Sequence, residues 1–258
     1  MYTQKVGLTE KIAIVEEIAQ IVGSENNTTH VLVPDNKAEI IIPLQNEITF
    51  SCIGSVRSLR LSENKAYFFM PRRRGAEIPM PANTKCLILK INPIYARKIA
   101  QGLSEISNGV FTLTLDKQQL SSICKYSKTK DIYGASDMIG DVLDHVNGLY
   151  DYNYTILDSI EQIRETSGTI SVKEIYSSLN VSKSKLEQHF NREVGLTPKE
   201  FCKIEKINCF INTYVEHGNI SLTELTYQCG YYDQSHVIKD FKYFLNTSPK
   251  KFFEHAIF

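Results

Sequence analysis

The feature that most constrains this chain is an internal repeat in its last third. The segment beginning at Ile170, ISVKEIYSSLNVSKSKLEQHFNREVGLTPKEF, aligns with the segment beginning at Ile220, ISLTELTYQCGYYDQSHVIKDFKYFLNTSPKKFF. The separation is fifty residues, and one extra residue in the second copy makes it fifty-one further on. Two copies of one short structural unit are therefore expected, each burying its apolar face against a neighbour.

Each copy opens with residues that begin a helix. A capping box, in which a hydroxyl and a carboxylate satisfy free backbone N–H groups, is predicted at Ser171 with Glu174 and at Ser221 with Glu224. The first helix of each copy then ends at a residue that tolerates left-handed geometry, Asn180 or Gly230. A tight turn should follow in both copies.

A second helix follows each turn, over residues 182–192 and 233–244. Leu186 with Phe190, and Val237 with Phe241, are spaced by four, so each pair lies on one face that can pack on the first helix. This is the helix-turn-helix arrangement, whose second helix enters the DNA major groove. The candidate DNA-contacting residues are Lys183, Ser184, Lys185, Glu187, Gln188, Gln234, Ser235, His236, Ile238, Lys239 and Lys242.

One long helix is predicted between the copies. Thr197, Pro198 and Glu200 supply a cap, a first-turn proline and a returning carboxylate, and apolar residues continue at helical spacing to about His217. Some twenty residues give roughly 30 Å of helix. That length is close to the ~34 Å between successive major-groove entries on one face of B-DNA, so one chain could fill two adjacent grooves.

The chain before residue 116 has a different pattern of apolar and turn residues. Short β-branched and aromatic runs, separated by turn residues, occur at 31–33, 39–42, 48–52, 66–70, 86–91 and 110–115. They predict a β-rich barrel or sandwich. Residues 10–22 suit either a helix or a strand, with the strand slightly favoured. Helical patterns follow after Asp116.

These patterns predict an α+β chain, with a β-rich N-terminal barrel or sandwich followed by an all-α C-terminal domain with two helix-turn-helix units. The expected divisions are a sensing or dimerisation domain at 1–118, a helical linker at 119–153 and a DNA-binding domain at 154–258. No stretch of eighteen apolar residues occurs, so no membrane span is expected and the protein is predicted to be cytoplasmic.

The C-terminal residues resemble the AraC/XylS family of bacterial transcription regulators. The resemblance covers residues 155–253, and the second-unit signature appears as GYYDQSHVIKDFKYFLNTSPKKF from Gly230 to Phe252. Upstream, VLVPDNKAEIIIPL and FFMPRRRGAEIPMP resemble the β-rich N-terminal region of one branch of that family. By residue matching, the positions that approach bases are Ser184, Gln188, Gln234, Ser235 and Lys239.

The resemblance implies a nucleoid-associated, sequence-specific regulator of promoter DNA. It allows RNA polymerase and a second copy of the chain as further partners, and it leaves the small-molecule effector unidentified. The sequence itself shows no nucleophile elbow, phosphate loop or zinc-type Cys/His spacing, so neither enzyme activity nor a metal or cofactor is predicted. The six cysteines are expected to be buried, reduced thiols.

Charge is the main objection to DNA binding. The chain has 29 basic and 29 acidic residues, and residues 154–258 hold 12 Lys and Arg against 13 Asp and Glu, a net charge of −1. DNA-binding domains are usually basic, so a local face must carry the contacts. Two alternatives stay open: a ligand-binding or catalytic β-barrel whose helical tail contacts proteins, and a non-specific architectural DNA binder. Arg72, Arg73 and Arg74 are interpreted as a charged turn between strands.

Overall fold

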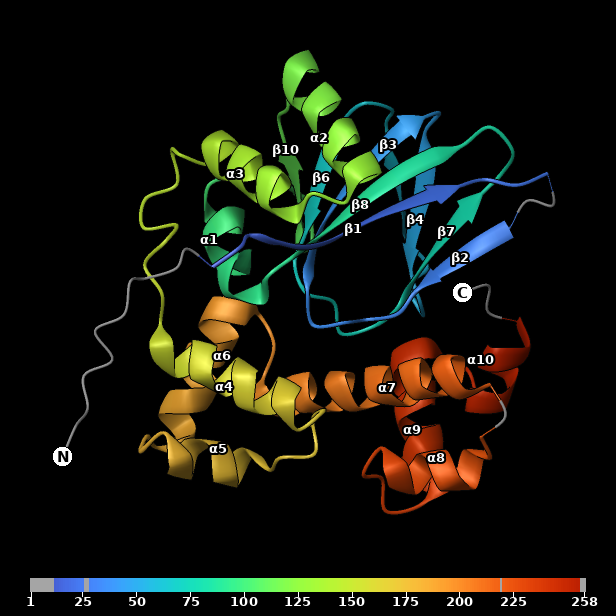
Figure 1. Ribbon diagram of the computed structural model, residues 1–258, viewed down its shortest axis with the longest axis vertical. Helices are drawn as coiled ribbons and strands as arrows, with labels where there is room; N and C mark the ends of the chain where they lie inside the picture. Colours follow the sequence, from blue (N-terminus) through green and yellow to red (C-terminus); the bar gives the residue numbers. More distant parts are fainter. Residues whose placement is uncertain (1–11, 26–27, 219, 256–258) are drawn as a thin grey trace.

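The computed structural model describes residues 12–25, 28–218 and 220–255, and in this part of the chain ten strands form two antiparallel sheets (Figure 1). The larger sheet has the order β1 (Val15–Val22), β8 (Lys85–Ile91), β3 (Ala38–Gln45), β6 (Ala66–Phe69), β10 (Val110–Leu113) and β9 (Ser104–Ser107). The smaller sheet has the order β2 (Thr28–Leu32), β7 (Ala76–Met80), β4 (Ile48–Cys52) and β5 (Ser58–Leu61). The β-rich prediction is confirmed in a two-sheet form, and the described part of residues 10–22 contains a strand.

The middle of the larger sheet is buried on both faces, which explains the continuous apolar run in β3. Ile41 packs between the two sheets with Phe50 and Ile78. Ile40 and Ile42 belong instead to the hydrophobic cluster on the other face of the sheet. Because side chains alternate along a strand, a strand covered on both sides needs apolar residues at consecutive positions.

Three helices cover the outer face of the larger sheet: α1 (Ala96–Gln101), α2 (Lys117–Thr129) and α3 (Ile132–Val142) (Figure 1). Ile99, Ile123 and Ile139 are fully buried in the same cluster as the sheet. The packing groups α2 and α3 with the strands, while the expected domain boundaries near residues 118 and 153 stay predictions.

The rest of the described chain is helical, and the two repeat copies form matching helix pairs. The helices are α4 (Tyr154–Glu165), α5 (Val172–Ser178), α6 (Lys183–Val194), α7 (Pro198–His217), α8 (Leu222–Gln228), α9 (Gln234–Leu245) and α10 (Pro249–His255). The first copy is α5 with α6, the second is α8 with α9, and α7 runs between them (Figure 1). The fold class expected from the sequence is therefore confirmed.

Local chemistry sets the helix ends as predicted, with one difference. Asn180 and Gly230 both adopt positive φ, 57° and 69°. Ser171 and Glu174 form both bonds of a capping box. At Ser221 the hydroxyl accepts from the backbone N–H of residue 224 at 3.1 Å, but the reciprocal bond is not formed in the described residues. The second predicted box is thus half formed, which still caps the helix.

The turn between β6 and β7, residues 70–75, joins the β-rich half to both helix pairs. The Arg73 guanidinium donates to the backbone oxygen of Gly195 at 3.0 Å and to Glu200 at 2.8 Å, where α6 ends and α7 begins. The backbone N–H of Gly75 donates to the oxygen of Phe244, near the end of α9, at 2.8 Å. The arginine-rich turn does lie between strands, and it also contacts the helical half.

Candidate nucleic-acid interface

The first reader is the outward face of α6. Its N-cap is Ser182, whose hydroxyl accepts from the backbone N–H of Lys185 at 3.3 Å. Leu186 and Phe190 are fully buried, as their spacing predicts. Along the rest of α6, the predicted contact residues are on the surface: Lys183, Ser184, Lys185 and Gln188 are exposed, and Glu187 is half-buried. Lys183 and Glu187 form an ion pair of 3.8 Å.

The second reader is the outward face of α9. Asp233 caps the helix by accepting from the backbone N–H of His236 at 3.0 Å, and Val237 is buried beneath it. The predicted contact residues Gln234, Ser235, His236, Ile238, Lys239 and Lys242 are all exposed. The Gln234 amide donates to the hydroxyl of Thr223 on α8 at 2.7 Å. Gln234 would have to break this hydrogen bond before its amide could bind the edge of a base.

The two readers lie at opposite ends of α7 (Figure 1). This helix is 20 residues long, or about 30 Å at 1.5 Å per residue. At its centre the ring of Phe210 meets the ring of Phe241 on α9 edge-on, with 5.5 Å between centroids. The packing of α7 therefore sets the separation between the readers.

A lysine stripe that was not singled out in the sequence lies on α7 between the readers. Lys199, Lys203 and Lys206 are spaced i, i+4 and i+7, which places them on one helix face. They line a cleft of about 650 Å³ whose other walls include the segment that leads into α5, residues 230–232, and the α9 residues His236, Lys239 and Asp240. The stripe thus extends the surface of the second reader.

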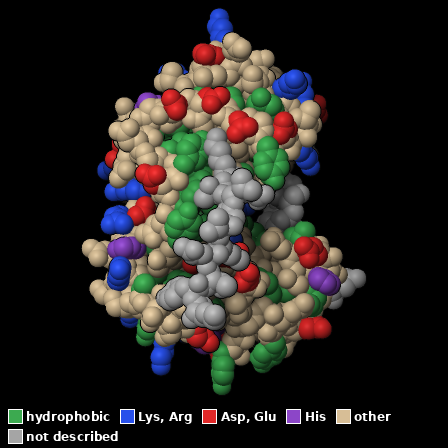
Figure 2. Space-filling model, turned by 60° about the vertical axis from the view of Figure 1, so that its left-hand side comes forward, with side chains coloured by type: hydrophobic (Ala, Val, Ile, Leu, Met, Phe, Trp, Pro, Cys, Tyr) green, Lys and Arg blue, Asp and Glu red, His purple; other side chains and the backbone are tan. Residues whose placement is uncertain are grey.

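The opposite face of α7 holds acidic and amide side chains and faces the β-rich half. Glu205 accepts from the amide of Asn36 at 3.0 Å, and the Asn208 amide donates to the backbone oxygen of Pro34 at 2.8 Å. Acidic and basic side chains are interspersed on the molecular face in Figure 2, in line with the zero net charge. Basic and acidic side chains thus lie on opposite faces of α7, so a domain of net charge −1 can still present a basic cleft.

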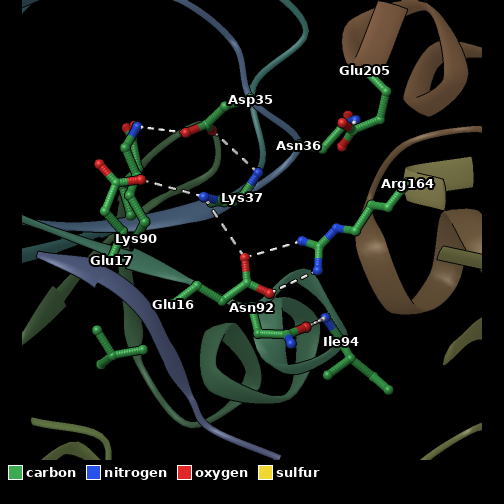
Figure 3. Close-up of polar contacts among 12 residues, drawn as sticks. Glu16, Glu17, Asp35, Asn36, Lys37, Lys90, Asn92, Ile94, Arg164 and Glu205 are labelled. Carbon is green, nitrogen blue, oxygen red and sulfur yellow. Dashed lines mark hydrogen bonds and ion pairs between the residues drawn. The ribbon is translucent and has the colours of Figure 1, made fainter. Parts of the chain in front are cut away.

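A cavity of about 700 Å³ lies between the β-rich and helical halves. Its walls come from β1, β2, β8, α4, α7 and α10. Figure 3 shows Glu16 of β1 between two cations. Both oxygens of Glu16 accept from the guanidinium of Arg164 on α4, at 2.9 and 3.0 Å, and Lys37 lies 3.8 Å away. The cavity is thus crossed by an ion pair that joins the two halves.

A group of buried charges lies beside this cavity, in the larger sheet. The Glu39 carboxylate, 1% exposed, contacts the ammonium of Lys90 and accepts from the guanidinium of Arg72 at 2.9 Å. Lys90 also pairs with Asp35 at 2.8 Å. Burial raises the pKa of Asp35, but the charge and hydrogen bond of Lys90, together with the charges of Lys37 and Arg72, lower the pKa overall. These four side chains form one network of paired charges inside the protein.

The described cysteines are all free thiols, although only part of the set is buried. Cys86, Cys202 and Cys229 are buried, whereas Cys52 is exposed, which corrects the expectation for that residue. The described residues contain no group of three or more His, Cys, Asp or Glu that could hold a metal ion. Nor does any helix among them have the length and apolar character needed to cross a membrane.

Comparisons with known proteins agree with this geometry. Residues 175–255, which span both helix pairs, match the family model of a helix-turn-helix domain. A search among curated protein sequences gives no significant match. The fold and this domain define a DNA-binding transcription regulator. Residues 175–255 thus form a helix-turn-helix domain of the AraC type.

Solved structures of ToxT from Vibrio cholerae share the fold over nearly the whole length. An apo ToxT variant from strain SCE256 is 12% identical, with a TM-score of 0.61, covering 93% of this chain and 97% of ToxT. Wild-type ToxT from the same strain, bound to an unsaturated fatty acid, is 12% identical, with a TM-score of 0.57 and coverages of 93% and 94%. ToxT from strain O395, bound to (E)-4-(8-methylnaphthalen-1-yl)but-3-enoic acid, is 11% identical, with a TM-score of 0.56 and coverages of 93% and 97%.

Proposed function

We propose that this regulator reads two adjacent major grooves of one duplex, with α6 in one groove and α9 in the next. The observation that carries the proposal is the exposure of both outward faces at opposite ends of a helix about 30 Å long. Gln188, Gln234, Ser235 and Lys239 supply the donors and acceptors that read base edges. The other predicted reader residues fix the register through phosphates and groove edges.

The lysine stripe on α7 extends this proposal to the DNA backbone between the two grooves. Lys199 is exposed, Lys203 pairs with Asp240 at 2.9 Å, and the Lys206 ammonium donates to the oxygen of Gly230 at 3.2 Å. Phosphates are strong acceptors for ammonium groups, and binding them releases counterions from the DNA. The stripe would therefore contribute affinity without sequence preference.

Replacing Gln234 by alanine is expected to relax base choice at one operator position. The amide can pair with an adenine edge, and its loss should cost about 1–3 kcal/mol for the preferred base. Fluorescence titration of the full chain with single-base operator variants at fixed salt measures this. Gln118→Ala, an exposed glutamine on α2, is the control and should bind like the wild type. An equal loss on every DNA sequence would contradict the role.

One comparison separates this function from the two alternatives. The full chain is titrated with the DNA upstream of its own gene and with a scrambled duplex of the same length at the same salt. Selective binding supports the regulator, equal binding to both duplexes supports an architectural binder, and no binding supports a helical tail that contacts proteins. The same assay at several protein concentrations tests whether a homodimer is the binding form.

The β-rich half is proposed to sense a small molecule in the cavity between the halves. A cavity of about 700 Å³ falls in the size range of ligand pockets, and ToxT, which shares the fold, has been solved with an unsaturated fatty acid bound. A ligand there would touch both halves and could change how the readers are held. The regulator would act at the nucleoid, with RNA polymerase as a further partner at the promoter.

A further inference from the structure

The ligand chemistry that suits the interdomain cavity can be deduced from the charges in its wall. Three cations line it, namely Lys37, Lys90 and Arg164. Arg164 is held by both oxygens of Glu16. Lys37 lies 3.8 Å from the same carboxylate and 3.4 Å from Glu17. Glu16 takes two of the five N–H donors of Arg164, so an anionic ligand would have to share these cations with the carboxylates already paired to them.

Lys90, the third cation, is the most firmly held. Its ammonium lies between Asp35, at 2.8 Å, and Glu39. Figure 3 shows it turned toward Asp35 at the far side of the cluster from Arg164. The nearby carboxylates raise its pKa, outweighing its burial, so it stays charged and satisfied. It offers nothing to a carboxylate ligand.

Among the carboxylates in the cavity wall, Glu205 has no ion-pair partner in the described part of the chain. Glu205 of α7 accepts a hydrogen bond from Asn36, yet no cationic side chain of the described residues lies within 4.0 Å of it. Burial and the charge of Asp35 raise the pKa of Glu205, outweighing the hydrogen bond from Asn36 and the charges of Arg164 and Lys37. The side-chain oxygen of Asn36, a fully buried residue, accepts no hydrogen bond. The Asn36 oxygen therefore lacks a donor, and the Glu205 carboxylate is held by a neutral amide instead of an ion pair.

Apolar side chains complete the cavity. Val31 and Val33 contribute from the β-rich half, and Ile211 and Phe252 from α7 and α10. They can cover a short hydrocarbon chain, while the acidic side near Glu205 receives a charged head. The residues that line the cavity include four carboxylates, those of Glu16, Glu17, Asp35 and Glu205, and three cations. Carboxylates therefore outnumber cations by one.

We propose that the cavity binds a small organic cation, an ammonium or guanidinium group on a short apolar body, with Glu205 as its counter-ion. This inference rests on the proposal that the cavity is the ligand site, and it specifies the charge of the ligand. A bound cation would bridge Glu205 on α7 and the β3-side segment that carries Asn36. The ligand would thereby tighten the junction between the halves.

The test uses three probes with the same eight-carbon chain: n-octylammonium, octanoate and 1-octanol. Each is titrated into the full chain by calorimetry. Octylammonium should bind with one-to-one stoichiometry and at least about tenfold more tightly than octanoate or octanol, since a charge-assisted bond in a partly buried site has about that effect. Octanoate binding as tightly as octylammonium, or octylammonium failing to bind, would overturn the inference.

Two variants locate the effect. Glu205→Gln keeps the shape and removes the charge, so it should reduce octylammonium affinity by about tenfold or more and leave octanol unchanged. Glu17→Gln should weaken octylammonium binding to a smaller extent, because that side chain is 54% exposed. Glu216→Gln, an exposed position near the end of α7, is the control and should bind like the wild type. Unchanged octylammonium binding in Glu205→Gln would also refute the assignment.

The outcome is separable from the proposed functions by two readouts on the same samples. Selective DNA binding with no preference for the amine would refute the charge assignment and leave the DNA-reading proposal standing. A preference for octanoate would retain the cavity as a ligand site with the opposite charge selectivity. If Glu205→Gln no longer unfolds cooperatively on heating, the variant is not properly folded. The test is then decided by Glu17→Gln and by the binding of the three probes to the wild type.

Discussion

Replacing Glu39 by glutamine is expected to lower the free energy of unfolding by about 3–5 kcal/mol, because it removes one member of a buried charged group. Glu39 faces both Lys90 and Arg72 from the middle of the larger sheet. In the variant, Lys90 would keep its ion pair with Asp35, whereas Arg72 would lose its ion pair with Glu39 and keep no other among the described residues. Urea unfolding followed by circular dichroism measures the loss.

The control is an ion pair of the same type on the surface. Glu47 lies 3.9 Å from Arg60, and both side chains are largely exposed, so Glu47→Gln should change stability by less than about 1 kcal/mol. Replacing Glu39, Lys90 and Arg72 together by apolar residues of similar volume should recover much of the stability. A loss from Glu39→Gln no larger than that from Glu47→Gln would show that the buried group is not held by charge.

The triple substitution of Lys199, Lys203 and Lys206 by glutamine should weaken DNA binding about equally for the operator and for scrambled duplex. Three lost phosphate contacts should reduce the slope of log affinity against log salt by about 3. The affinity loss should be largest at low salt, about tenfold or more, and should shrink as salt rises. Fluorescence anisotropy at four salt concentrations gives both quantities.

A matched control exists on the β-rich half, where α2 and its C-cap carry three exposed lysines, Lys125, Lys128 and Lys130. Their triple substitution changes the net charge by the same amount but should leave the salt slope unchanged. Because Lys203 also pairs with Asp240, unfolding curves of both variants are compared to separate stability from binding. An unaltered slope in the α7 variant would place the DNA away from the stripe.

The helical half was predictable because its signals are local. Caps at Ser171 and Thr197, left-handed residues at Asn180 and Gly230, and apolar spacing each act within a few residues of the chain. They define where helices begin and end, and the internal repeat does so twice. The exposure of the reader faces followed from the same spacing, whereas the base or phosphate that each reader residue contacts stays a prediction.

The elements that were missed depend on distant contacts. The short strands β5, β7 and β9 were not expected, and β7 contains Pro79, which weakens a strand pattern. In the structure β7 is stabilised by pairing with both β2 and β4. The cavity and the arginine contacts join residues more than a hundred positions apart, such as Glu16 with Arg164. No local pattern in the sequence encodes such pairs.

The contacts of residues 70–75 affect the DNA sites that the protein can accept. One short turn touches the end of α6 and the end of α9, so the two helices cannot shift independently without breaking its hydrogen bonds. The full chain should therefore discriminate sharply between operators whose half-sites are separated by different numbers of base pairs. A series of operators with one base pair inserted or deleted between half-sites would measure this, and Arg73→Ala should broaden the accepted range. Spacing tolerance would then depend on a connection between two strands that lies outside the predicted DNA-contacting residues.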